Sequence, residues 1–179
     1  MEREFAVLTA IGSDRVGITS DLSEAITQGS CNIEESRMAV LGGEFAIIML
    51  LSGGSASLAA AIDNLPGAGR ALGLQIEVKR TTAGEPSASG RPYRLTTVSL
   101  DTPGIVHTVT AVLKRHGINV EELETETSAA PWTGAPMFRM EAQVVVPPTV
   151  QVSVVRERAQ EAAAQPGHRH RVPAGPRRG

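Results

Sequence analysis

The chain has 179 residues, 41% of them hydrophobic and 20% charged, which is enough to bury one large core or two small ones. Its formal net charge of -2 gives no overall positive field of the kind that holds nucleic acid, so we expect no direct nucleic-acid binding. Cys31 is the only cysteine, which excludes an internal disulfide and a cysteine-rich zinc site and favours a cytoplasmic location.

Residues 1–80 carry six segments with strand or helix periodicity. In chain order they are a strand over 4–11, a helix over 16–28, strands over 31–41 and 44–51, a helix over 57–72 and a strand over 74–79. Gly42-Gly43 suits a tight hairpin turn, whereas Pro66-Gly67 is expected to end or kink the second helix. This order is the split βαβ pattern of ferredoxin-like folds, so we predict one complete α+β module.

Residues 81–92 are mainly Ser, Ala, Gly and Pro and are predicted to form a linker. The second module is predicted over residues 93–164. Its elements are strands over 93–100, 118–127 and 137–146 and helices over 104–116 and 150–164. The loop over 128–136 is longer than the first hairpin turn and is a candidate lid. Neither module contains an apolar run long enough to cross a bilayer, so no membrane role is expected.

Residues 165–179 contain three prolines and no strand pattern, and we predict that they form a disordered basic tail. The second module is therefore expected to lack its last strand. Its first strand would then keep an unpaired edge, which another chain or the first module could cover.

The two halves match without a gap at an offset of 87 positions. The matching pairs are Leu8 and Leu95, Thr9 and Thr96, Asp14 and Asp101, Gly17 and Gly104, Ile18 and Ile105, Asn32 and Asn119, Glu34 and Glu121, and Glu35 and Glu122. Identical turns at equal spacing indicate a duplicated module. A module repeated without a catalytic grouping more often binds a ligand than reacts with it.

Each half has an Asp-x-x-Gly turn that opens a helix, at residues 14–17 and 101–104. In the second turn, Thr102 is expected to cap the helix and Pro103 to be its first residue. Free N–H groups at a helix start attract a carboxylate, and a nearby Asp or Asn oxygen can accept a hydrogen bond from an ammonium group. These groups together suit an α-amino acid. The alternative is that the aspartates only order the turns and the glycines only allow close helix-to-sheet packing.

Asn32 and Asn119 open the second strand of each module, where we expect them to lie beside the turns and to join the site. The alternative is that each satisfies loop backbone groups. Glu34-Glu35 and Glu121-Glu122 could be taken for acid/base pairs, but neighbours along a strand point to opposite faces, so a solvated strand is the preferred interpretation.

Other candidate reactive groups do not form a catalytic set. Ser20 and His107 occupy matching helix positions without the nucleophile motif of a hydrolase, so no catalytic residue is predicted. His168 and His170 offer too few ligands for a closed metal site. We therefore predict neither a metal nor a cofactor.

These motifs resemble tandem ACT domains, specifically those of glycine cleavage system transcriptional repressors. The resemblance covers roughly residues 4–160. Its motifs are Gly12-Ser-Asp-Arg-Val-Gly-Ile, Cys31-Asn-Ile-Glu-Glu-Ser, Asp101-Thr-Pro-Gly-Ile-Val, His116-Gly-Ile-Asn-Val-Glu-Glu-Leu and Thr133-Gly-Ala-Pro-Met-Phe. It implies a pair of ferredoxin-like modules that senses a small amino acid, with glycine and serine as natural candidates.

The resemblance also implies which residues bind the ligand. They are Asp14, Arg15, Val16, Gly17, Asn32 and Ile33 in the first module, and Asp101, Pro103, Gly104, Asn119 and Val120 in the second. Thr102 departs from the pattern, since the family often has Arg there. The implied function is that of a regulatory protein that is not an enzyme and that acts as a homo-oligomer or through a regulatory partner. The alternative is a ligand-independent interaction module that acts on a transcription factor or an enzyme.

Overall fold

The computed structural model describes residues 3–82 and 90–164. The chain divides into two compact units, Met1–Glu85 and Pro86–Gly179, and each is described by itself. Residues 83–89 of the predicted linker and the whole of the predicted tail lie outside the described residues. The flanking strands take in both ends of that linker, because the last strand of the first unit reaches Thr81 and the first strand of the second begins at Arg91.

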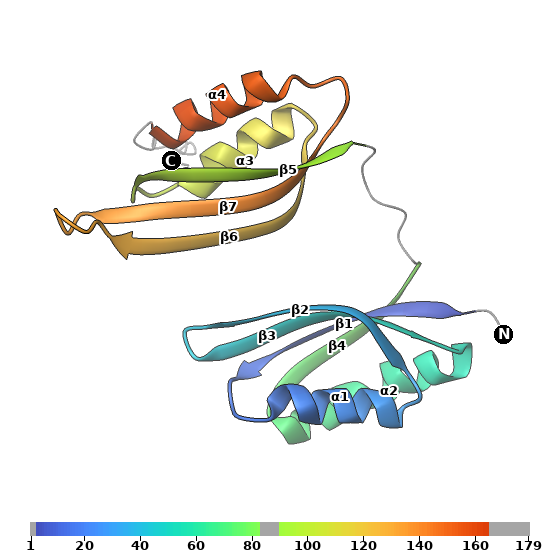
Figure 1. The fold of residues 1–179 in the computed structure, drawn as a ribbon. Coiled ribbons are helices and arrows are strands. Elements are labelled where there is room, and N and C mark those ends of the chain that lie inside the picture. The colour runs from blue at the N-terminus through green and yellow to red at the C-terminus, as the bar shows by residue number, and fades with distance from the viewer. Residues whose placement is uncertain (1–2, 83–89, 165–179) are drawn as a thin grey trace, which may run out of the picture. The chain divides into compact units, whose positions relative to one another are not determined.

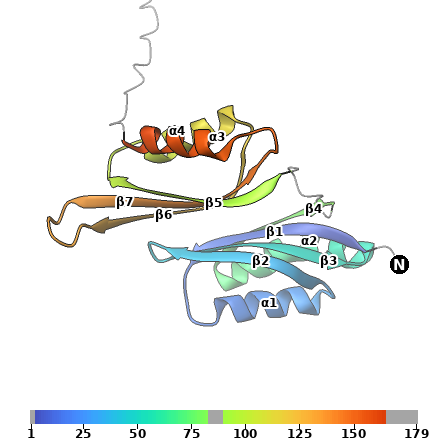
Figure 2. The same ribbon diagram turned by 45° about the horizontal axis from the view of Figure 1, so that its top comes forward.

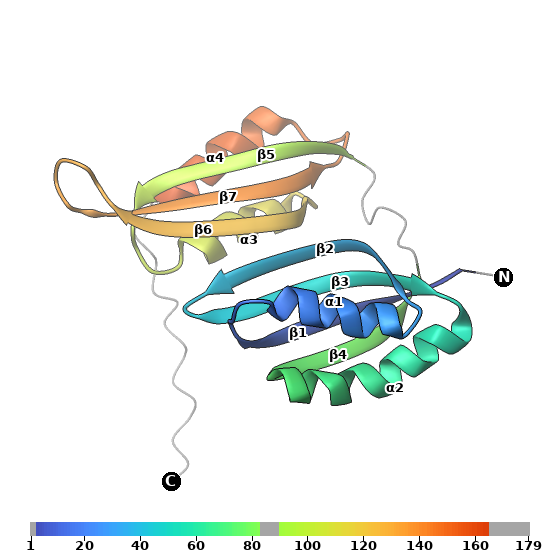
Figure 3. The same cartoon turned by 60° about the horizontal axis from the view of Figure 1, so that its bottom comes forward.

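The first unit is a four-stranded antiparallel sheet with two helices on one face (Figures 1 and 3). Its elements are β1 (Glu4–Ser13), α1 (Ile18–Gln28), β2 (Asn32–Leu41), β3 (Glu44–Gly53), α2 (Ser55–Leu72) and β4 (Leu74–Thr81). The strand order is β2-β3-β1-β4. This is the complete ferredoxin-like α+β module that the sequence predicts.

Alternation along the strands places one side-chain set under the helices. In β1, Ala6, Leu8 and Ala10 are buried while their neighbours are more exposed, as expected for a period of two. In α1, Ile18, Leu22 and Ile26 recur every four residues and pack into the same core. The space between the sheet and its two helices is therefore occupied by the hydrophobic core.

Pro66 does not end the second helix, so of the two predicted effects, an end or a kink, the end is wrong. The helix α2 is continuous from Ser55 to Leu72 with Pro66 inside it. A proline within a helix removes one backbone hydrogen bond. Buried residues lie on both sides of it, Leu58 and Ala61 before and Leu65 after, and this packing holds the two halves of the helix on one core.

The second unit repeats this plan with one strand fewer (Figure 2). Its elements are β5 (Arg91–Leu100), α3 (Ile105–Arg115), β6 (Asn119–Ala129), β7 (Pro136–Val146) and α4 (Val152–Ala164). The strand order is β5-β7-β6, both pairs are antiparallel, and the described residues contain no fourth strand. The expectation that the second module lacks its last strand concerns residues 165–179, which lie outside the described part of the chain, and it stays a prediction.

Candidate functional site

The first Asp-x-x-Gly turn joins β1 to α1 and is fastened to the neighbouring hairpin. The backbone N–H of Asp14 donates to the carbonyl of Gly43 at 3.0 Å. Gly17 then takes a left-handed conformation with φ of 85°, and α1 begins at the next residue. Because L side chains rarely adopt this conformation, the turn requires glycine at this position.

The second turn has the same construction. The N–H of Asp101 donates to the carbonyl of Pro136 at 2.9 Å, and Gly104 is left-handed with φ of 95°. The helix α3 begins at Ile105, with Gly104 as the capping residue and no side-chain cap. The expectation that Thr102 caps the helix and that Pro103 is its first residue is therefore wrong, because the left-handed glycine delays the helix.

Open space surrounds both glycines. A Cβ built on Gly17 or Gly104 would have no heavy atom within 4 Å beyond its chain neighbours. Close helix-to-sheet packing is thus not the reason for glycine at these positions. Backbone conformation is the reason, and the space in front of each helix start is free.

Hydrogen-bond donors of the first helical turns face that space. Within the described residues, the N–H groups of Thr19 and Ser20 in α1, and of Val106 and His107 in α3, have no backbone acceptor. Such groups, together with the helix dipole, favour an anion. The side chain of Asp14 is exposed and makes no hydrogen bond or ion pair with any described residue, so an acceptor for a cationic group stands beside them.

The two turns differ in their side chains. In the first, the Arg15 guanidinium pairs with the Asp21 carboxylate at 2.6 Å. The matching residues of the second turn are Thr102 and Thr108, and the Thr108 hydroxyl donates to the Gly104 carbonyl at 2.9 Å. Both members of the ion pair are replaced together. The sequence analysis missed Asp21, although this paired exchange between the repeats was visible in the sequence.

Val16 and Pro103 are also matching residues, and both are exposed at their turns. Val16 is 100% exposed, so its side chain contacts nothing in the described unit. An apolar side chain held fully in water beside free N–H groups is suited to contact with a ligand or a second protein surface.

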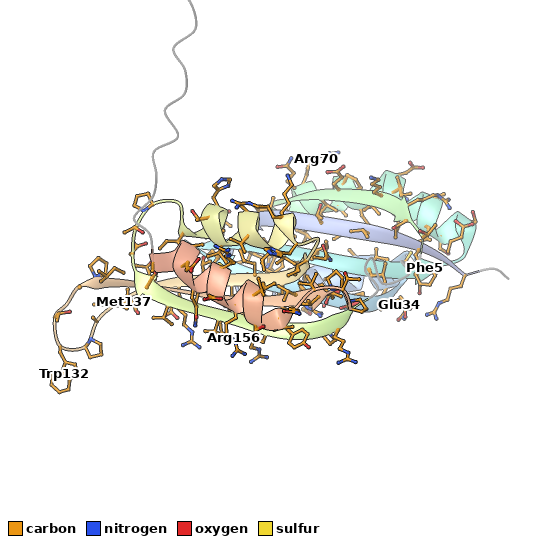
Figure 4. All side chains as sticks on the ribbon, turned by 90° about the horizontal axis from the view of Figure 1, so that it is seen from above. Phe5, Glu34, Arg70, Trp132, Met137 and Arg156 are labelled. Carbon is orange, nitrogen blue, oxygen red and sulfur yellow. The ribbon has the colours of Figure 1, made fainter. Side chains whose placement is uncertain are left out.

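Asn32 and Ile33 do not lie beside the turn of their own module, and this expectation is wrong. Asn32 pairs with Ser52, which pairs with Phe5 near the start of β1, whereas the turn follows Ser13 at its end. Nine positions at about 3.3 Å each separate the two ends, roughly 30 Å. Figure 4 labels Phe5 and Glu34 close together at one end of the sheet.

The second module repeats this separation. Asn119 pairs with Val145, which pairs with Pro92 near the start of β5, while Asp101 follows its end. Val120 is the next residue of β6 and lies at the same end as Asn119. The two predicted sets of ligand residues can therefore meet only if the turn of one module approaches the second strand of another module or copy.

Asn32 belongs instead to a polar cluster that the sequence analysis did not identify. One oxygen of Glu34 accepts hydrogen bonds from Ser52 Oγ at 2.5 Å, from Asn32 Nδ2 at 2.8 Å and from Arg3. The hydrogen bonds from Ser52 and Asn32, and the charge of Arg3, lower the pKa of Glu34. The lone serine near the end of the apolar strand β3 was the available signal.

The adjacent glutamates do not form an acid/base pair. Each second strand has a β-bulge, between Ile33 and Glu35 and between Val120 and Glu122, so simple alternation fails there. Glu34 binds Arg3, while Glu35 pairs with Arg37 at 3.0 Å. Each carboxylate therefore pairs with a different arginine. Glu34 is also hydrogen-bonded to neighbouring side chains, so it is not simply a solvated residue of the strand.

The remaining predictions concern the loop and the histidines. Trp132, in the β6–β7 loop, is 97% exposed, so its side chain packs against almost nothing in the described conformation (Figure 4). His168 and His170 lie outside the described residues, within which no three His, Cys, Asp or Glu side chains are placed to hold a metal ion. None of the described helices has the length and apolar character of a membrane span.

Two ferredoxin-like modules in one chain, each with a glycine turn at its first helix, define a tandem ACT-domain protein. The family model for the ACT domain matches residues 4–79. The glycine cleavage system transcriptional repressor of Escherichia coli is 36% identical over 128 residues, which cover 72% of this chain and 67% of that protein. The chain belongs to the family of that repressor.

Solved structures agree with this assignment. An unknown protein from Galdieria sulphuraria matches with a TM-score of 0.74 and 40% identity, covering 89% of this chain and 93% of its own. A structure named as a candidate glycine cleavage system transcriptional repressor matches with a TM-score of 0.65 and 25% identity, over 88% of each chain. Both matches span the two modules, so the tandem arrangement is shared.

Proposed function

We propose that this protein is a non-enzymatic cytoplasmic regulator that binds a small amino acid, glycine or serine, and modulates a partner in the regulation of glycine cleavage genes. The construction of the two turns carries the proposal. Each offers unpaired N–H groups, a left-handed glycine and open space in front of a helix. An α-carboxylate suits the N–H groups, and the free Asp14 carboxylate suits an ammonium group.

The separation of the two ligand sets supports an interface site. Asp14, Arg15, Val16 and Gly17 occupy one end of a module, and Asn32 and Ile33 the other. A ligand held by both sets would join the turn of one module to the second strand of another module or copy. It would bind one arrangement of modules better than another, and such coupling is typically about 1 to 3 kcal/mol.

The test is calorimetric titration of the full chain with glycine and with serine. Gly17→Val puts a β-branched residue at positive φ, and Asn32→Ala removes an amide from the second set, so we expect both to abolish or greatly weaken binding. Gly134→Val is the matched control, because Gly134 is also left-handed, with φ of 69°, and belongs to neither predicted ligand set. This control should bind normally.

Two results would refute the site. If the Gly17→Val and Asn32→Ala variants bind as the unaltered chain does, the residues are wrong. If neither amino acid binds at any concentration tested, the sensor hypothesis itself is wrong.

A second candidate is a ligand-independent interaction module, which Trp132 favours. An indole that is 97% exposed at a loop tip is typical of a contact with another protein. Co-purification of a stable partner, together with a melting temperature that no amino acid raises, would favour this function over sensing, because a ligand of the native state alone raises that temperature.

A further inference from the structure

Within the part of the chain that the structure describes, the edge strand β5 is paired on one side only. It pairs with β7 from Arg91 to Leu100, and no described strand lies on its other edge. In the first unit β4 fills the matching place, pairing with β1 from Phe5 to Gly12. An unpaired edge of ten residues is a template for another strand.

A groove accompanies this free edge. A cavity of about 510 Å³ lies between the second half of β5 and the end of α4. Its lining residues are Thr96, Thr97, Val98, Ser99, Leu100, Thr102, Gln160, Ala163 and Ala164. The Ser99 hydroxyl is buried and has no hydrogen-bond partner among residues 3–82 and 90–164. A buried hydroxyl without a partner is costly, so the groove is incomplete as it stands.

The space through which β4 is entered in the first unit is not left open along β5 in the second. In the first unit, a Cβ on Gly12 would lie 2.3 Å from the Gly73 carbonyl oxygen, at the connection from α2 into β4. The residue that matches Gly12 is Ser99, whose Cβ occupies that space. Gly73 is also left-handed, with φ of 77°, whereas Gln165 follows α4. The occupant must enter from elsewhere.

We propose that the free edge of β5 pairs with β5 of a second copy of this chain, antiparallel about a two-fold axis at Thr96. Antiparallel partners point to the same face, so this register keeps each residue on its own side of the sheet. The pairs are Pro92 with Leu100, Tyr93 with Ser99, Arg94 with Val98, Leu95 with Thr97, and Thr96 with Thr96. The two modules then share one six-stranded sheet.

Charge favours a second copy as the partner. The only charged residues of β5 are Arg91 and Arg94, both in its first half. Antiparallel pairing places them against the uncharged second half of the other copy, and Arg91 comes opposite Asp101. Like charges directly opposite each other would destabilise the pair, and this register has none.

Exposed apolar side chains on β5 are also suited to contact with the second copy. Val98 and Leu100 are 56% and 61% exposed, and Tyr93 is 39% exposed. In this register the ring of Tyr93 comes opposite Ser99 of the other copy and enters the groove beside α4. A phenol group next to the unpartnered hydroxyl supplies both apolar volume and a hydrogen-bonding partner.

The first experiment tests the register by sedimentation analysis of the full chain over a concentration series, without ligand. We expect a dimer. Val98→Lys sets two ammonium groups against the Arg94 side chains and should raise the dimer dissociation constant about tenfold or more, whereas Val98→Glu should leave it unchanged or lower it. Val98 also lies opposite Arg139 of β7 within the chain, so the unfolding free energy of each variant is measured alongside to separate an effect on folding from an effect on the dimer.

The second experiment tests the axis by thiol cross-linking. Thr96→Cys brings two thiols directly opposite each other, and we expect oxidation to produce a covalent dimer. In the control Arg94→Cys, the two thiols are four residues out of register, about 13 Å apart, and should stay unlinked. The native Cys31 is buried and is present in both variants.

Three outcomes would overturn the proposal. The unaltered chain could remain monomeric, the Lys and Glu variants could dimerise equally, or the Thr96→Cys variant could cross-link only after removal of residues 165–179, which would make the tail the occupant. None of these measurements involves an amino acid, so they fail or succeed independently of the sensing function.

Discussion

The two modules preserve the same backbone and differ in side chains and in one sheet edge. Both have a left-handed glycine before the first helix and an Asp N–H bonded to the following hairpin, at Gly43 in one and Pro136 in the other. Only the first module has the Arg15–Asp21 pair and the β4 strand. The backbone of the turn is thus what duplication retained, and its polar side chains are not required for the turn to form.

The sheet edge gives a second contrast, and the residues Gly12 and Ser99 mark it. Gly12 leaves room for the chain that enters β4, and Ser99 closes the same space. The first module completes its own sheet, while the second presents an open strand.

Exchanging these two residues should have the largest effect. Gly12→Ser places a Cβ 2.3 Å from a backbone oxygen, so we expect the first module to lose about 3 kcal/mol of unfolding free energy. Ser99→Gly in the second module should change stability little, because the removal of a buried unpaired hydroxyl offsets the entropy cost of glycine. Urea unfolding of the full chain measures both, and similar losses in the two variants would contradict the comparison.

Substitution of the turn glycines should lower the unfolding free energy by the same amount in both modules. Gly17→Ala and Gly104→Ala each hold a Cβ at positive φ in open space, so we expect each to cost about 1 to 2 kcal/mol. The costs should be equal within error in denaturant unfolding. A much larger cost at one turn would mean that its glycine also provides room for a neighbouring group.

Replacing side chains of the first turn by those of the second should change the unfolding free energy less. Arg15→Thr combined with Asp21→Thr removes an exposed ion pair, which is typically worth about 0.2 to 1 kcal/mol. Binding of glycine or serine should weaken more than stability does if Arg15 contacts the ligand. The reciprocal Thr102→Arg and Thr108→Asp variant serves as the control, and a double-mutant cycle isolates the pair.

The pH dependence of the unfolding free energy should show the smallest difference between the modules, and Glu34 is its source. Its pKa is lowered in the folded chain, so its stabilising contribution is present at neutral pH and is lost as the pH falls through that lowered value. In the Glu34→Gln variant, the unfolding free energy should therefore fall less steeply as the pH is lowered. The matching Glu121→Gln should leave that pH dependence unchanged, because the residues matching Arg3 and Ser52 are Gly90 and Val145. A steeper fall in the Glu34 variant would contradict this prediction.

Several elements follow from the sequence without tertiary information. Apolar residues at periods of two and near four fix which segments are strands and helices, and the 87-residue offset shows that the module is duplicated. The sequence also predicts that residues 165–179 form no strand, since they contain prolines and lack alternation. These are local properties, set by each residue and its near neighbours.

The composition of the site depends on tertiary structure. Asn32 follows α1 closely in sequence, yet the helix returns the chain to the opposite end of the sheet, so register decides which residues lie near the turn. Pro66 is accommodated because packing on both sides holds α2 together. Gly12 and Ser99 differ by one side chain, and only the position of Gly73 shows what that difference excludes. Sequence patterns report local periodicity, while contacts between distant segments arise only when the sheet is assembled.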